Sequence, residues 1–127
     1  TPCVSVEKSN ASGTLLNGSY FAVIAYCLDG QKITDYFKPS NVQPLFDHDN
    51  VAGSIDILIE GADRTFDEFE LVVVSLINSQ TVAKRIGLYN ITQTRVTLDT
   101  IDPTLPTVPL DQIPFMVTVY DKTDAMY

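Results

Sequence analysis

The chain has 127 residues, of which 45% are hydrophobic, and this size and composition suit one globular domain with a single core. Its 16 acidic and 8 basic side chains give a net charge of −8, which argues against nucleic acids and anionic membrane surfaces as partners. The longest apolar block, Tyr20 to Leu28, is too short to insert across a membrane. Because the chain opens on Thr-Pro-Cys and stops at Asp-Ala-Met-Tyr, we expect both ends to lie within a longer protein.

The first part of the chain predicts three strands. Val4 to Glu7 alternates apolar and polar residues, which is typical of a short strand. Ser19 to Leu28 is apolar on both faces, which predicts a central strand covered on both sides. Its faces alternate, with Tyr20, Ala22, Ile24 and Tyr26 on one and Phe21, Val23, Ala25 and Cys27 on the other. Asp29-Gly30 then predicts a two-residue hairpin turn, and Gln31 to Phe37 predicts a more polar return strand near an edge.

The middle of the chain predicts a long loop followed by four more strands. Lys38 to Gly53 holds two prolines and a polar cluster, so we expect a surface loop there. The strands are expected at Ser54 to Glu60, Phe66 to Ile77, Thr81 to Tyr89 and Thr94 to Asp99. The positions expected to face the core are Ile55, Ile57, Ile59, Val82, Ile86, Leu88, Val96 and Leu98.

The composition changes at Asp102, after which Pro103, Pro106, Pro109 and Pro114 follow in short order. Proline cannot donate to a strand ladder and is confined to edges and turns. We therefore divide the chain into a β-sandwich domain at residues 1–101 and an extended arm or linker at residues 102–127 that leads to a following domain. Deletion of the arm is expected to leave a folded domain that assembles poorly, although Phe115 to Tyr120 is β-prone and could pair with either neighbour.

Seven short strands separated by turn signals, with no helical apolar stripe, predict an all-β fold. The specific expectation is an antiparallel β-sandwich of about seven strands.

The sequence offers one cluster of metal-ligand side chains, Asp47-His48-Asp49 followed by Asn50. Their oxygens and imidazole suit a cation, but the spacing matches neither a calcium loop nor a zinc pattern. A solvated acidic loop tip is the interpretation we favour, so we predict no metal site and no cofactor.

A second acidic group, Asp67, Glu68 and Glu70, raises the question of acid–base catalysis. Glu68 and Glu70 fall on one face of a strand and Asp67 on the other, whereas glycoside hydrolysis needs two carboxylates across a cleft. Charged residues at the entry of a buried strand explain them better. No nucleophile–base motif surrounds the single histidine, so we predict no catalytic residues and no enzyme.

Two features keep a secreted protein open as an alternative. Asn10, Asn17 and Asn90 each begin a glycosylation sequon, although Asn, Ser and Thr also gather in β-turns, which is the interpretation we favour. Cys3 and Cys27 are the only cysteines, and they fit either one disulfide or two free thiols.

A series of phrases runs through the chain in a distinctive order: Leu16 to Tyr26, Asp29-Gly30, Asp35 to Ser40, Gly53 to Ile57, Asp63 to Val74, Thr81 to Tyr89 and Val96 to Asp99. Over about residues 14–120 this series resembles fibronectin-III-like sandwich domains in tail and portal-vertex proteins of crAss-like tailed bacteriophages. The resemblance implies a sandwich of the fibronectin-III/immunoglobulin-like kind and a structural role in a virion assembled in the bacterial host cytoplasm. It also implies other subunits as partners, unmodified sequons and reduced cysteines.

The expected function is therefore that of a non-catalytic assembly module in a larger phage protein. The regions expected to contact other subunits are the Lys38 to Gly53 loop and the arm. The alternative is a secreted or cell-surface module for adhesion or carbohydrate binding, glycosylated and carrying a Cys3–Cys27 disulfide.

Overall fold

The computed structural model describes residues 1–46 and 51–114, which form ten β-strands and one short 3-10 helix. The elements are β1 (Cys3–Lys8), β2 (Leu15–Leu16), β3 (Gly18–Leu28), β4 (Gln31–Lys32), β5 (Gln43–Leu45), β6 (Val51–Gly53), β7 (Ile55–Glu60), β8 (Glu68–Ile77), β9 (Gln80–Asn90), β10 (Arg95–Leu98) and η1 (Leu110–Gln112). The predicted all-β antiparallel sandwich is confirmed. The count of about seven strands is wrong, because β5 and β6 form in the segment expected to be a surface loop and β2 forms where no strand was expected.

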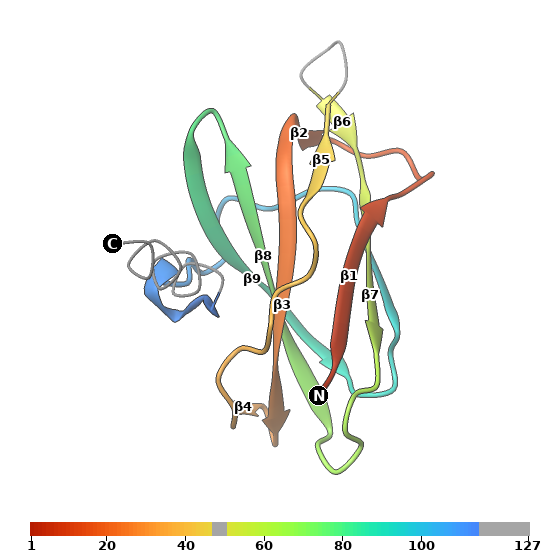
Figure 1. Ribbon diagram of the computed structural model, residues 1–127, viewed down its shortest axis with the longest axis vertical. Helices are drawn as coiled ribbons and strands as arrows, with labels where there is room; N and C mark the ends of the chain where they lie inside the picture. The colour runs from red at the N-terminus through yellow and green to blue at the C-terminus, as the bar shows by residue number, and fades with distance from the viewer. Residues whose placement is uncertain (47–50, 115–127) are drawn as a thin grey trace, which may run out of the picture.

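Two sheets face each other across the main core (Figure 1). One has three strands in the order β1-β7-β10, and the other has the order β4-β3-β8-β9 with β5 also pairing with β3. The strands β2 and β6 form a separate pair at one end. The hairpin turns after β3 and β8 each use two residues with positive φ, Asp29-Gly30 and Asn78-Ser79, as tight hairpins require. The first of these confirms the turn predicted from the sequence.

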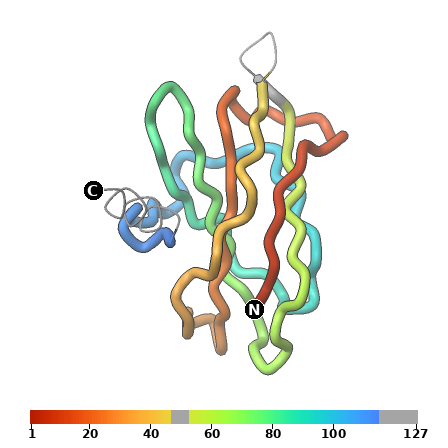
Figure 2. Tube along the Cα trace, in the orientation of Figure 1, coloured from red at the N-terminus to blue at the C-terminus, as the bar shows by residue number. Residues whose placement is uncertain are grey.

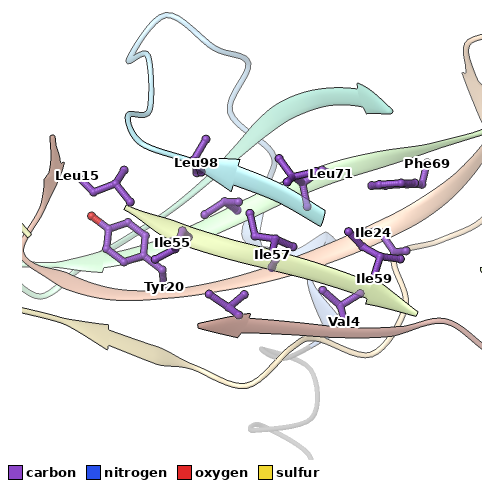
Figure 3. Close-up of a cluster of buried hydrophobic side chains, with 14 of the residues drawn as sticks. Val4, Leu15, Tyr20, Ile24, Ile55, Ile57, Ile59, Phe69, Leu71 and Leu98 are labelled. Atoms are coloured by element: carbon purple, nitrogen blue, oxygen red, sulfur yellow. The ribbon is translucent and has the colours of Figure 1, made fainter. Parts of the chain in front are cut away.

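The core between the sheets is built from alternating residues, as the periodicity predicted. Figure 3 shows Ile55, Ile57 and Ile59 of β7 pointing toward Ile24 and Leu71 of the opposite sheet. Val96 and Leu98 of β10 are buried in the same cluster, so these inward positions are confirmed. At one end of the core the Tyr26 ring stacks on Phe66, with 4.5 Å between centroids, and meets the edge of Phe37 at 4.8 Å. Burial of this apolar surface is the main stabilising contribution to the fold.

The central strands are buried on both faces, which confirms the prediction for β3. Its second face belongs to a separate cluster on the outer side of the five-stranded sheet. The members of this outer cluster are Phe21, Val23, Ala25, Tyr36, Val72, Val74, Ala83, Val108 and Ile113. The residues that cover the sheet here come from the segment after β4 and from the proline-rich arm.

The return strand predicted for Gln31 to Phe37 is largely wrong, because regular pairing stops at Lys32. The following residues still run beside β3 and bond to it irregularly. Ile33, Phe37 and Ser40 each donate a backbone N–H to a β3 carbonyl, at 2.9 Å. The side-chain oxygens of Thr34 and Ser40 accept from the backbone N–H groups of Tyr26 and Ala22, at 3.0 and 2.9 Å. Hydroxyl groups thus replace ladder carbonyls, which satisfies the edge of β3 without a strand.

Asn41 ties this irregular segment to the opposite sheet. Its Nδ2 atom donates to the Val6 carbonyl at 2.8 Å, and its Oδ1 atom accepts from the Val6 N–H at 2.9 Å. One side-chain amide therefore satisfies both backbone groups at the middle of β1.

The inward position predicted for Leu88 is wrong, and Tyr89 takes its place. A bulge shifts the register between β8 and β9, so that Leu71 pairs with Gly87 while Val72 pairs with Arg85. An extra residue in one strand reverses which side chains face inward beyond it. Tyr89 accordingly packs on the core and stacks on Phe69 at a centroid distance of 5.6 Å.

The described part of the arm, residues 102–114, lies against the five-stranded sheet. Figure 2 traces this blue segment to the side of the molecule formed by the green β8–β9 hairpin. Val108 and Ile113 are buried there, and η1 lies between these two residues in the chain. The division of the chain at residue 101 stays a prediction, but these contacts bear on it, since the segment covers part of the outer cluster.

Candidate functional site

The most developed binding surface in the described residues is the edge of β9, where the arm is bound. Lys84 and Thr107 form an antiparallel bridge. Around it Arg85 donates its backbone N–H to the Pro106 carbonyl, and Val108 donates to the Ala83 carbonyl, both at 2.9 Å. This is the geometry of an extended peptide added to a sheet edge.

The side chain of Lys84 also forms hydrogen bonds to this part of the arm. Its ammonium group donates to the carbonyls of Pro103 at 3.1 Å and Leu105 at 3.0 Å, and to the Thr107 hydroxyl at 3.0 Å. Three acceptors from alternate residues meet one cation, so Lys84 fixes the path of the arm over five residues. Hydrogen bonds from a charged donor are among the stronger kinds in proteins.

Apolar side chains complete the contact on the outer face of the sheet. Ile113 is fully buried and Val108 is 7% exposed, and both pack in the outer cluster with Phe21, Val72 and Val74. A fully buried aliphatic side chain contributes about 1.5–3 kcal/mol relative to an exposed one. The bound arm therefore combines backbone pairing, a charged clamp and two apolar anchors.

A buried polar cluster lies beside this surface and joins three separate segments. Glu70 of β8 is buried, and its Oε2 atom accepts a hydrogen bond from the Tyr36 hydroxyl. Its Oε1 atom lies 2.9 Å from Nε of Arg85, an ion pair in which the N–H is poorly aligned for a hydrogen bond. Burial, followed by the hydrogen bond to Glu70, raises the pKa of Tyr36 well above its usual value. The Tyr36 hydroxyl is thus a fixed donor to this carboxylate.

The two cysteines are free thiols in very different surroundings, so the structure contains no Cys3–Cys27 disulfide. Cys3 is exposed at the start of β1, whereas Cys27 is fully buried near the end of β3. Burial raises the pKa of the Cys27 thiol, and the charges of Glu70 and Glu68 raise it further. Cys27 is therefore held as a neutral, unreactive thiol.

Two cavities open on the described surface. One of about 230 Å³ lies under the start of the arm and includes Leu15, Tyr20, Lys84, Ile101 and Pro103 in its wall. Another of about 180 Å³ lies between the turns at residues 61–64 and 91–94. Neither contains a charged pair or a nucleophile–base contact of the kind that catalysis uses.

The candidates from the sequence are not brought together. Asp47, His48 and Asp49 lie outside the described residues, and within the described ranges no group of three His, Cys, Asp or Glu side chains could hold a metal ion. Asp67 and Glu70 serve different partners, because Asp67 accepts from the Asp29 backbone N–H at 3.1 Å whereas Glu70 pairs with Arg85.

The sequons show no shared site either. Asn10 and Asn90 are exposed and Asn17 is half-buried. Asn90 is engaged locally, since its Oδ1 atom accepts from the backbone N–H and the hydroxyl of Thr92 at 3.0 and 2.8 Å.

Sequence reasoning missed Glu70, Arg85 and Lys84 as members of a site. The signal for Glu70 was its position, since it shares a strand face with Val72 and Val74 and needs a partner once that face is buried. No comparable signal identified Lys84, because its acceptors are backbone carbonyls of a distant segment.

In the described part of the chain no helix is long and apolar enough to cross a membrane. Comparison with protein-family models finds no match, and comparison with curated proteins finds none either.

Proposed function

We propose that this chain is a non-catalytic structural module that joins protein segments within a larger assembly, such as the virion of a tailed bacteriophage. The observation that carries the proposal is the arm bound along β9. The sandwich binds an extended polypeptide through backbone bonds to Ala83 and Arg85, the Lys84 clamp and a buried apolar face. Strand addition of this kind is a common mode of protein–protein recognition.

Exposed apolar side chains at one end of the sandwich support contact with a neighbouring subunit. Leu16 is 54% exposed and Phe46 is 66% exposed. They lie near each other because β5 pairs with β3 in a register that places Leu45 opposite Gly18. Phe46 also belongs to the Lys38 to Gly53 segment, which was expected to make contacts. Large exposed aromatic side chains are enriched at protein interfaces.

The surface charge agrees with protein partners. The net charge of −8 disfavours a phosphate backbone as a partner.

The test is the state of the protein in the cells that produce it. We expect it to sediment with large protein particles and to carry bare asparagines at 10, 17 and 90 and two free thiols by mass spectrometry. A free, slowly sedimenting protein with attached glycans and a Cys3–Cys27 disulfide would instead support the alternative, a secreted adhesion or carbohydrate-binding module. The exposure of Asn10 and Asn90 is the observation that keeps this alternative in the test.

A further inference from the structure

We propose that the arm is exchanged between copies of this chain, so that residues 106–113 of one copy bind β9 and the outer cluster of the next. The partner is thus a second copy of the same chain. This inference rests on the proposed function and deepens it, because it names what the strand-addition site binds in the assembly.

The first argument is that the contacts of the arm are complete in themselves. Docking of residues 106–113 uses two backbone bonds, the bond from Lys84 to the Thr107 hydroxyl and the burial of Val108 and Ile113. Every one of these groups is present in a second copy, so an arm from a neighbour finds the same partners as the chain's own arm. Exchange of an identical element between protomers is for this reason a low-cost route to oligomers.

The second argument is that a short hinge separates the arm from the core. Ile101 packs against the main core, and the backbone pairing with β9 begins at Pro106. The residues between them form a local turn. Leu105 donates to the Asp102 carbonyl at 3.1 Å, and the Asp102 Oδ1 atom accepts from the Thr104 N–H and hydroxyl at 2.8 and 2.7 Å. Opening this turn breaks its local bonds and the bonds from Lys84 to the Pro103 and Leu105 carbonyls, which water can replace at the surface.

The reach of the opened hinge suits a neighbour in contact. Four extended residues span about 13 Å, so the β9 edge of the neighbour must lie within that distance of Ile101. Pro103, Pro106 and Pro109 stiffen the segment, so less conformational freedom is lost when it binds in a second copy. The attached arm has an effective concentration of about 1 mM at its own site, so exchange is expected where copies are held side by side.

The experiment asks which chain supplies the arm. Lys84 and Thr107 face each other in the bridge, and the flanking bonds make them a non-hydrogen-bonded pair, with Cα atoms about 4.5 Å apart. A disulfide fits this spacing. One full-length chain carries Lys84→Cys and another carries Thr107→Cys, both with Cys3→Ser to remove the exposed thiol. The two are mixed, loosened in mild urea, returned to buffer at high concentration and oxidised.

We expect a disulfide-linked heterodimer whose yield rises with concentration. It should exceed several-fold the yield with Gln112→Cys, a matched control that places an exposed thiol on the same arm away from the bridge. A yield equal to that control at every concentration would overturn the proposal. A chain carrying both Lys84→Cys and Thr107→Cys should close its bond within one chain when dilute and between chains when concentrated.

A second variant tests the inference with Lys84 intact. Deletion of Thr104 and Leu105 removes the turn closed by Asp102 and Leu105 and shortens the hinge, which is expected to oppose folding of the arm back on its own sheet. We expect this variant to form dimers or larger closed species in sedimentation, with Val108 still protected from hydrogen exchange. A monomer with an unprotected arm would contradict exchange.

The two proposals fail separately. If native protein sediments with particles but no heterodimer forms, arm exchange is wrong and the assembly function stands. If native protein is a free glycosylated monomer, the assembly function is wrong, and exchange in purified protein would then be a property of the fold without that role.

Discussion

Arg85 contacts Glu70 diagonally across the β8–β9 pair, and the ion pair is buried at one end only, since the Glu70 side chain is 7% exposed and that of Arg85 is 38% exposed. The carboxylate also holds the Tyr36 hydroxyl, so three segments meet at one charge. Removal of the cation leaves a buried carboxylate with a single neutral donor.

We expect Arg85→Met to lower the free energy of unfolding by about 1–3 kcal/mol, because the buried charge loses its counterion while water reaches part of the gap. Lys8→Met, an exposed change on β1, is the control, and it should alter stability by less than about 0.5 kcal/mol. Urea unfolding measures both variants. Equal changes would show that the Arg85–Glu70 pair does not stabilise the fold.

The two thiols should differ sharply in reactivity. In native protein we expect a maleimide to label Cys3 alone, and in denaturant to label both cysteines, because Cys27 is fully buried with a raised pKa. Intact mass before and after labelling counts the adducts. A protein that takes no label until it is reduced would carry the disulfide that the structure lacks.

Alkaline pH should destabilise the fold through its buried tyrosines. Burial raises the pKa values of Tyr20, Tyr36 and Tyr89 above the ordinary value of 10.0, with the hydrogen bond to Glu70 adding to the shift of Tyr36. The folded state therefore binds more protons than the unfolded state above about pH 10. The stability that these groups contribute is complete below that pH and is lost as the pH rises through their folded pKa values.

Circular dichroism and phenolate absorbance, followed together, test this sign. We expect part of the tyrosine ionisation to coincide with unfolding above about pH 10. If all six tyrosines ionise at the ordinary value while the fold persists, the buried hydroxyl groups are not as the structure places them.

Loss of the Lys84 clamp should loosen the arm and spare the sandwich. In Lys84→Met we expect the Val108 and Arg85 amides to exchange with solvent about tenfold or more faster, since the charged donor to three acceptors is gone. Amides at the centre of β3 should keep their protection. Lys8→Met, an exposed change on β1, is the control. Uniformly faster exchange in both variants would mean that the clamp has no local role.

Gly13 packs where no side chain fits. A Cβ atom there would lie 2.3 Å from the Gly53 carbonyl oxygen and 2.8 Å from that of Asp99. Backbone must move, so Gly13→Ala is expected to cost about 1–3 kcal/mol of stability in thermal unfolding. Gly61→Ala is a useful comparison, because its nearest contact is an ordinary 3.7 Å and only its φ of +72° opposes a side chain, at about 1 kcal/mol. A larger loss of stability in Gly61→Ala than in Gly13→Ala would contradict the prediction that close packing at Gly13 is the stronger constraint.

The sequence was most informative where one periodicity ran without interruption. Alternation in β3 and β7 predicted both which residues are buried and which face they occupy, because a strand has only two faces. The bulge opposite Leu71 defeated the same reasoning in β9, since one inserted residue moved Tyr89 inward in place of Leu88.

The binding surface could be predicted only in part. The double-sided burial of β3 implied a cover for the outer face, but no pattern identified Val108 and Ile113 as that cover. The path of the segment after β4 could not be predicted either. There the hydroxyl groups of Thr34 and Ser40 accept the hydrogen bonds that backbone carbonyls accept in a regular strand. Contacts of this kind depend on where distant segments meet, and local sequence does not encode that meeting.

The Asn41 amide limits where another chain can pair with this domain. An open strand edge recruits any chain that offers a matching row of donors and acceptors, which is how aggregation begins. On β1 the outward donor and acceptor of Val6 are already occupied by one rigid amide. Fibre growth by stacking on β1 is therefore blocked at the middle of the strand.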